Sequence, residues 1–287
     1  MIPATFDYHK ATSVDEALKL LSDLDDAKLL AGGHSLIPTM RLRLAEPANL
    51  IDISGIDTLR GISKNDTGDV IIGATATHYE IESSELVQSI APLLAAAAAS
   101  IGDVQVRNRG TIGGSLTHAD PNADYPAAIL ASDAQITIQG QGGTREVAAS
   151  DFFQGLFETA VGEDELITQV RIAAPAAGTG SAYLKLKHPA SGFAVVGAAA
   201  SVTVSNGQCT SAKLAFTGLT THAFRASNVE AALTGNAIDE AAITSAAQQA
   251  GEGIDFTEDS FASAAYRASL AKTYAKRALL AALADSG

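Results

Sequence analysis

Capping boxes and apolar spacing along the chain predict where its helices begin. In a capping box, a hydroxyl and a glutamate three residues later each bond to the other's backbone amide. Ser13 with Glu16 precedes an apolar stripe at helical spacing, and Thr77 with Glu80 precedes a helical region that extends to Ala99. Both positions therefore predict amphipathic helices packed on a core.

Short apolar runs between polar or glycine residues predict strands. Residues 107–115 are typical of a glycine-punctuated loop, whereas the apolar residues 127–131 favour a short helix. The Asn206-Gly207 pair is typical of a tight hairpin turn. The predicted strands are 28–31, 49–53, 69–74, 135–139, 145–147, 165–172, 182–187, 193–204 and 209–217.

A change in composition divides the chain. Residues 173–180 are small and uncharged and contain proline and glycine, which is typical of a linker. After this linker come three predicted strands and then three predicted helices. Ser227 with Glu230 is predicted to cap the first helix, and the others begin near Asp239 and Ser263. An antiparallel sheet with helices to one side is the simplest packing for that order. The chain is therefore expected to be α+β, with a second, smaller domain that contains a three-stranded antiparallel sheet.

Composition excludes several classes of protein. The 287 residues include 19 Lys and Arg against 32 Asp and Glu, which gives a net charge of −13, so we expect no nucleic-acid partner. The single cysteine, Cys209, cannot form an internal disulfide or hold an iron–sulfur cluster alone. The most apolar run, residues 93–101, is too short to cross a bilayer, and no secretory signal is visible, so a soluble, cytoplasmic protein is expected.

Two segments with paired glycines are the best candidates for chemistry. The first glycine segment, Ala31–Leu36, follows a predicted strand, and the second glycine segment comprises Thr111–Leu116. Glycine allows successive backbone amides to approach an oxygen cluster, and the nearby serines can add hydroxyl donors. Neither segment contains lysine or arginine. Together they predict a site for a diphosphate, although each pair taken alone could be a tight turn.

Other chemistry lacks support in the sequence. There is no Gly-x-Gly-x-x-Gly that opens a long helix and no P-loop, so the usual nucleotide folds are disfavoured. His118, Asp120 and Asp124 resemble a metal site, but a hydrogen-bonded loop explains them better. Ser115 lacks a nucleophile elbow, Cys209 lies in a predicted strand, and no acid–base pair emerges. The sequence thus predicts neither catalytic nor metal-binding residues, only a two-domain binder of a phosphate-bearing ligand.

The glycine segments carry a family resemblance. The chain resembles the FAD-binding medium subunits of molybdenum hydroxylases, the xanthine dehydrogenase family, and within it most closely those of aerobic carbon monoxide dehydrogenases. The similarity also includes residues 1–9, the segment 107–121, the pair Gly192-Phe193 and Tyr266-Arg267. The resemblance implies an FAD-binding (PCMH-type) region over residues 1–175, split near residues 55–60, and a C-terminal flavoprotein domain over residues 181–287.

The resemblance also assigns residues to the cofactor. The two glycine segments would surround the pyrophosphate and ribityl chain, and Phe193 stands where relatives carry a bulky residue beside the isoalloxazine ring. An aromatic side chain there can shield one face of the ring. The expected FAD-binding residues are Ala31, Gly32, Gly33, His34, Ser35, Leu36, Thr111, Ile112, Gly113, Gly114, Ser115, Asp124, Lys185 and Phe193.

The implied function is electron transfer. The chain would take electrons from [2Fe–2S] clusters on a small partner subunit, after oxidation at molybdopterin on a large subunit, and pass them to an external acceptor. Such subunits form a dimer of heterotrimers that could associate with a membrane only through partners. A stand-alone flavin oxidase or dehydrogenase, and a non-enzymatic module with degenerate loops, are the alternatives. The substrate could be carbon monoxide, an aldehyde or an N-heterocycle, and the acceptor a quinone, NAD or oxygen.

Overall fold

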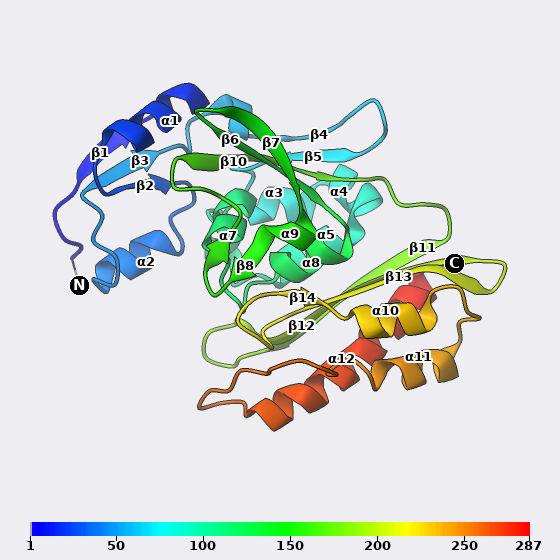
Figure 1. Cartoon of the computed structure of the whole chain (residues 1–287). Coiled ribbons are helices and arrows are strands. Elements are labelled where there is room, and N and C mark those ends of the chain that lie inside the picture. Colours follow the sequence, from blue (N-terminus) through cyan, green and yellow to red (C-terminus); the bar gives the residue numbers. More distant parts are fainter. Residues whose placement is uncertain (1) are drawn as a thin grey trace.

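A parallel sheet forms the N-terminal end of the molecule (Figure 1). The computed structural model describes residues 2–287. In this first sheet the strand order is β1-β3-β2 and both pairings are parallel, so helices must connect the strands. Its elements are β1 (Asp7–Lys10), α1 (Val14–Asp23), β2 (Ala27–Leu30), α2 (Leu36–Arg41) and β3 (Asn49–Asp52).

Helix α1 begins where the sequence predicts, with a modified cap. The Ser13 side chain accepts the backbone N–H of Glu16, as a capping box requires. The Glu16 carboxylate instead accepts the backbone N–H of Thr12 at 2.8 Å and its hydroxyl at 2.6 Å. Ala17 and Leu18 are buried against the first sheet, so the apolar stripe faces inward as expected.

An antiparallel central sheet follows, with strand order β4-β5-β10-β6-β7. The hairpin predicted between residues 135–139 and 145–147 is present as β6 and β7. A pair of short strands, β8 and β9, lies beside it. The elements of this part are η1 (Asp57–Leu59), β4 (Ile62–Lys64), β5 (Val70–Gly73), β6 (Gln135–Gly140), β7 (Gly143–Ala148), α9 (Ala149–Phe152), β8 (Phe153–Gly155), β9 (Glu158–Thr159) and β10 (Glu165–Ile172).

Helices fill the space between the central sheet and the C-terminal sheet (Figure 1). The predicted helical region up to Ala99 is divided into three helices, and its capping box of Thr77 and Glu80 forms completely. The largest buried side chains of this layer include Tyr125, Leu94 and Ile129. The helices are α3 (His78–Ser83), α4 (Glu85–Ile90), α5 (Pro92–Ser100), α6 (Val104–Arg107), α7 (Ile112–His118) and α8 (Tyr125–Ala131).

The C-terminal sheet is antiparallel, with strand order β11-β12-β13-β14. Asn206 and Gly207 have positive φ, as a two-residue hairpin between β12 and β13 requires. The expected number of three strands is wrong, because the two residues of β14 add a short fourth strand to β13. The strands are β11 (Thr179–Lys187), β12 (Ala194–Ser205), β13 (Gln208–Thr217) and β14 (Phe224–Arg225).

Three helices cover the outer face of the C-terminal sheet: α10 (Ser227–Leu233), α11 (Glu240–Ala247) and α12 (Ala264–Asp285). The N-cap of α10 is Ala226, not the predicted Ser227. The reason is that the Glu230 carboxylate, which the prediction assigned to a cap, accepts bonds from Arg225 and from the backbone N–H of Leu214. Glu230 therefore fastens α10 to the sheet.

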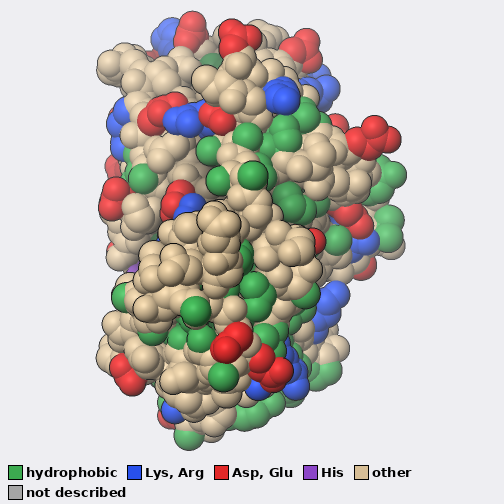
Figure 2. All heavy atoms as spheres, turned by 90° about the vertical axis from the view of Figure 1, so that its right-hand side faces the viewer, with side chains coloured by type: hydrophobic (Ala, Val, Ile, Leu, Met, Phe, Trp, Pro, Cys, Tyr) green, Lys and Arg blue, Asp and Glu red, His purple; other side chains and the backbone are tan. Residues whose placement is uncertain are grey.

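Charges of both signs are dispersed on the face shown in Figure 2, among apolar and backbone atoms. That face carries no broad basic surface, in keeping with the net charge of −13. None of the helices within residues 2–287 has the length and apolar character needed to cross a membrane.

A buried arginine holds helix α12 to the sheet. Arg267 is 4% exposed, and its guanidinium donates to the carbonyl oxygen of Val195 at 2.8 Å and to that of Gly218. It also donates to the Asp259 carboxylate at 2.5 Å. These bonds satisfy two backbone carbonyls where β12 begins and β13 ends.

We expect Arg267→Met to lower the free energy of unfolding by about 3 kcal/mol, because it leaves buried carbonyls without a donor. The matched control is Lys19→Met, which removes an exposed ion pair with Asp23 on α1. The free energy of unfolding of Lys19→Met should stay within about 0.5 kcal/mol of that of the wild type. Urea unfolding followed by circular dichroism measures both changes, and equal stabilities for the two variants would contradict the role given to Arg267.

Candidate functional site

The first glycine segment leaves a row of unpaired backbone donors. It connects β2 to α2, and residues 34 and 35 in it are exposed. Across the part of the chain that is described, the N–H groups of residues 32–36 donate no hydrogen bond to another residue. Gly33 has φ +74°, a left-handed conformation that favours glycine. This backbone can therefore offer successive N–H groups to an anionic oxygen cluster.

The second glycine segment is built differently from the prediction. The expected loop over residues 107–115 contains the end of α6 and the beginning of α7, because Thr111 caps α7. Its amides are already paired, so they cannot converge on a ligand as expected. The bonds run from Ile112 to the Ala76 carbonyl (3.1 Å), from Gly113 to the Ala74 carbonyl (2.8 Å) and from Gly114 to the Thr111 hydroxyl (3.3 Å). What this segment presents outward is exposed Gly114 and half-buried Ser115.

Gly32 of the first glycine segment contacts the turn that precedes the second segment. A Cβ atom on Gly32 would overlap the carbonyl oxygen of Arg109 and lie 2.9 Å from the Cα of Gly110. Real Cβ atoms are not found at such distances, so only glycine permits this approach. The first segment thus packs directly on the turn that leads into the second, although they are far apart in sequence.

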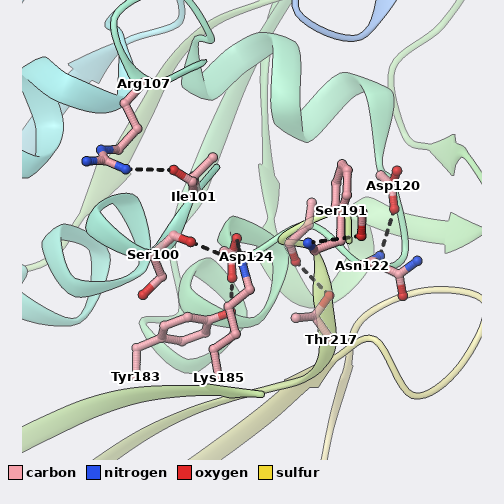
Figure 3. A network of polar contacts seen from close by, with 12 residues as sticks. Ser100, Ile101, Arg107, Asp120, Asn122, Asp124, Tyr183, Lys185, Ser191 and Thr217 are labelled. Carbon is pink, nitrogen blue, oxygen red and sulfur yellow. Dashed lines mark hydrogen bonds and ion pairs between the residues drawn. The ribbon is translucent and has the colours of Figure 1, made fainter. Parts of the chain in front are cut away.

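Asp124 and Lys185 form a buried ion pair where α8 meets β11 (Figure 3). The Lys185 ammonium donates to the Asp124 carboxylate at 2.8 Å and to the carbonyl oxygen of Ser100 at 3.1 Å. The Tyr183 hydroxyl donates to the other carboxylate oxygen at 2.5 Å. Burial raises the pKa of Asp124 and lowers the pKa of Lys185, and each charge opposes the shift of the other.

Phe193 lies on the turn between β11 and β12, with its side chain 45% exposed. The next residue, Ala194, donates its N–H to the carbonyl oxygen of Asn122 at 3.2 Å. The Thr217 hydroxyl donates to the carbonyl oxygens of Pro121 and Ala123, both at 2.7 Å. The C-terminal sheet therefore holds the loop that joins α7 to α8.

Of the predicted residues, the structure places Gly32 against residues 109 and 110, directly before the second glycine segment, and it pairs Asp124 with Lys185. The ion pair bonds internally and to Tyr183 and Ser100, not to the glycine segments. The side chains considered as a metal site have separate partners, since the His118 ring contacts Phe157. The assignment of these residues to FAD stays a prediction.

His78 and Tyr125 are buried beside the turn before the second glycine segment, and neither was singled out from the sequence. A Cβ on Gly110 would lie 2.5 Å from Nε2 of His78, so the imidazole rests on the turn before the second glycine segment. The His78 and Tyr125 rings meet edge to face at 5.2 Å. Nδ1 of His78 and the Tyr125 hydroxyl have no hydrogen-bond partner among residues 2–287. Only the Thr77 cap, which places residue 78 at a helix start, was visible in the sequence.

Comparison with known proteins defines the class as flavoprotein components of molybdenum-containing oxidoreductases. Residues 4–175 match the family model described as the FAD binding domain in molybdopterin dehydrogenase, and residues 181–282 match the CO dehydrogenase flavoprotein C-terminal domain. The chain belongs to this family. The predicted family and the predicted α+β class are confirmed.

Relatives match over nearly the whole chain. The carbon monoxide dehydrogenase medium chain of Hydrogenophaga pseudoflava is 42% identical over 285 residues, covering 99% of both chains. The 6-hydroxypseudooxynicotine dehydrogenase complex subunit alpha of Paenarthrobacter nicotinovorans is 37% identical, covering 99% of this chain and 96% of that protein.

Solved structures agree with these sequence relatives. Carbon monoxide dehydrogenase from Hydrogenophaga pseudoflava superposes with a TM-score of 0.96 at 45% identity, covering 99% of both chains. Quinoline 2-oxidoreductase from Pseudomonas putida 86 superposes with a TM-score of 0.94 at 32% identity, covering 100% of this chain and 99% of that one. The chain is thus an oxidoreductase component, and the alternative of a stand-alone flavin oxidase is set aside.

The residues present fit FAD at the first glycine segment. Five successive N–H groups without a partner among the described residues, two of them on glycines, supply donors that phosphate oxygens can accept. The contact at Gly32 keeps the neighbouring segment close enough to form a second wall. The second segment lets the cofactor come close to its backbone, but its paired amides do not supply a set of donors.

His78 makes the stability of the site depend on pH. Burial, with smaller contributions from His34 and Arg107, lowers the pKa of His78 from 6.5 to about 4. The unfolded chain therefore binds this proton more tightly than the folded protein does. The stabilising contribution is complete above the ordinary histidine pKa and is lost as the pH falls toward about 4.

We expect the wild type to lose about 2 kcal/mol more unfolding free energy than His78→Gln when the pH falls from about 7 to 5. The comparison uses the difference between two pH values, so any fixed cost of the substitution cancels. Urea unfolding at both pH values measures it. Parallel pH dependences of the two proteins would show that His78 is not a buried neutral imidazole.

Proposed function

We propose that this chain holds one FAD and transfers electrons within a molybdenum hydroxylase of the carbon monoxide dehydrogenase type. The observation that carries the proposal is the row of N–H groups at residues 32–36 that have no partner among the described residues, with Gly32 packed on the turn that leads into the second glycine segment. The match of both family models supports FAD as the occupant. When bound, FAD would supply a carrier that can take up electrons one at a time, as [2Fe–2S] clusters deliver them, and release them singly or in pairs.

Each part of the chain has a distinct task in this proposal. Residues 31–36 donate to the pyrophosphate, and residues 111–115 line the adjoining part of the cofactor. Asp124 and Lys185 place a compensated ion pair on the flavin side, and Phe193 covers an edge of the ring. The FAD-binding region would comprise residues 1–175, split near residues 55–60, with the C-terminal domain at 181–287; the family models matched at 4–175 and 181–282 support the outer division.

The redox partners must be separate chains. Cys209 is buried in β13 and is the only cysteine, so this chain cannot hold a [2Fe–2S] cluster. A small subunit would supply the clusters and a large subunit the molybdopterin, in a dimer of heterotrimers. The curated relatives are likewise medium chains or subunits. The assembly is expected in the cytoplasm, where a quinone, NAD or oxygen would accept the electrons.

The substrate is oxidised on the large subunit in this proposal, so it is not selected by this chain. Relatives named for carbon monoxide, for glyceraldehyde and for 6-hydroxypseudooxynicotine all align over at least 97% of the chain. A medium subunit of one fold is therefore compatible with different substrates. Carbon monoxide is the candidate favoured by the two carbon monoxide dehydrogenase medium chains at 42% and 38% identity.

Gly33→Val is expected to weaken FAD binding at least about tenfold, because a β-branched residue at φ +74° distorts the donor row. The matched control is Gly207→Val, which has φ +76° on a hairpin with open space around it. Both variants carry similar backbone strain, but only Gly33 lies at the site. Flavin absorbance after gel filtration measures retention, and Gly114→Val tests the second segment in the same way. Full FAD occupancy in Gly33→Val would contradict the assignment.

The assembly predicts a second result. Expressed with its partner chains, the protein should co-purify with a molybdenum-containing large chain and a cysteine-rich small chain. Light scattering should give twice the summed mass of one copy of each. Steady oxidation of an organic substrate by the isolated chain, at the rate of the assembly, would contradict the proposal.

A further inference from the structure

The turn that carries Phe193 is organised around His188. Nδ1 of His188 accepts the backbone N–H groups of Ala190 at 3.2 Å and Ser191 at 3.3 Å. The His188 N–H donates to the carbonyl oxygen of Phe193 at 2.8 Å, and the His188 carbonyl accepts the N–H of Gly192 at 2.9 Å. One residue thus supplies a partner to four groups of the turn, in the manner of an Asx turn before proline.

The His188 ring is itself held from the C-terminal layer. It meets the Phe261 ring edge to face, with centroids 4.5 Å apart. The Asp259 carboxylate accepts the N–H of Phe261 at 2.8 Å and the guanidinium of Arg267 at 2.5 Å. Arg267 also donates to the carbonyl oxygen of Val195. Val195 is the second residue of β12, the strand that follows the turn. These contacts connect β12 through Arg267 on α12 to Asp259 and Phe261, and through the His188 ring back to the turn.

We propose that His188 is a positioning residue that fixes Phe193 at the entrance to the flavin and so sets how far external electron acceptors can approach. The proposal rests on the proposed function, which places Phe193 beside the ring. The Phe193 side chain is 45% exposed, and Gly192 before it has φ +74° with open space around it. Within residues 2–287 the Phe193 N–H itself has only a long bond, 3.4 Å, to the Ser191 hydroxyl, so the bonds to His188 are the main restraints within the turn.

The two bonds to Nδ1 can be separated from the ring contact by substitution. His188→Ala removes the two bonds to Nδ1 and also the ring contact with Phe261. His188→Asn retains an acceptor at the position of Nδ1, and Asn before proline favours the same turn, but it loses the contact with Phe261. His9→Ala is the control, since His9 contacts Asn49 in the first sheet.

Hydrogen exchange of the full chain tests the turn itself. In His188→Ala, peptides that include residues 190–193 should exchange about tenfold faster, as the loss of roughly 1.4 kcal/mol of protection predicts. His188→Asn should restore most of the protection, and His9→Ala should leave it unchanged. Unchanged exchange in His188→Ala would overturn the proposal. This measurement does not depend on FAD.

Iodide quenching of flavin fluorescence in the FAD-loaded chain tests the consequence. His188→Ala should raise the quenching constant several-fold at equal FAD content, and in the assembled enzyme it should change the KM for the acceptor more than kcat. Faster exchange with unchanged quenching would overturn the positioning role. A wild-type chain that exchanges as predicted but holds no FAD would instead overturn the proposed function, and with it the placement of Phe193 at a flavin.

Discussion

The site depends on the contact between Gly32 and the backbone of Arg109 and Gly110. Because no Cβ fits there, the strand-to-helix connection after β2 can lie directly on the turn before α7. This contact joins the connection after the first sheet to the helical layer, beside the N–H groups of residues 32–36, which have no partner among the described residues. Any side chain at position 32 would separate the two walls, whatever its polarity.

The second constraint is the buried ion pair of Asp124 and Lys185 with the Tyr183 hydroxyl. Such pairs contribute little net stability, since desolvation offsets their attraction, but breaking one leaves a buried charge. Here the pair connects the helical layer to the C-terminal sheet, and both side chains are less than 5% exposed. Its contribution is therefore a specific attachment between these two layers more than a gain in stability.

Local rules predicted the elements, and long-range contacts account for the differences. The Thr77 capping box forms because both of its partners are sequence neighbours. The Glu230 box fails because Arg225 and a strand amide compete for the same carboxylate. The glycine segments were visible as local patterns in the sequence. The hydrogen bonds from the amides of the second segment to the carbonyls of Ala74 and Ala76, just after β5, were not visible there. His78 could not be found at all, because its role depends on packing against residue 110.

The chemistry of the site follows from its neutral walls. Its donors are backbone N–H groups and a hydroxyl, and the low pKa of His78 keeps that imidazole uncharged near neutral pH. The buried charges of Asp124 and Lys185 compensate each other. A protein with net charge −13 can hold an anionic ligand in this way without a cationic patch, because successive N–H dipoles supply a positive potential at the ligand oxygens themselves. Selectivity is then set by geometry, which is why the turn fixed by His188 can control access without altering the charge of the site.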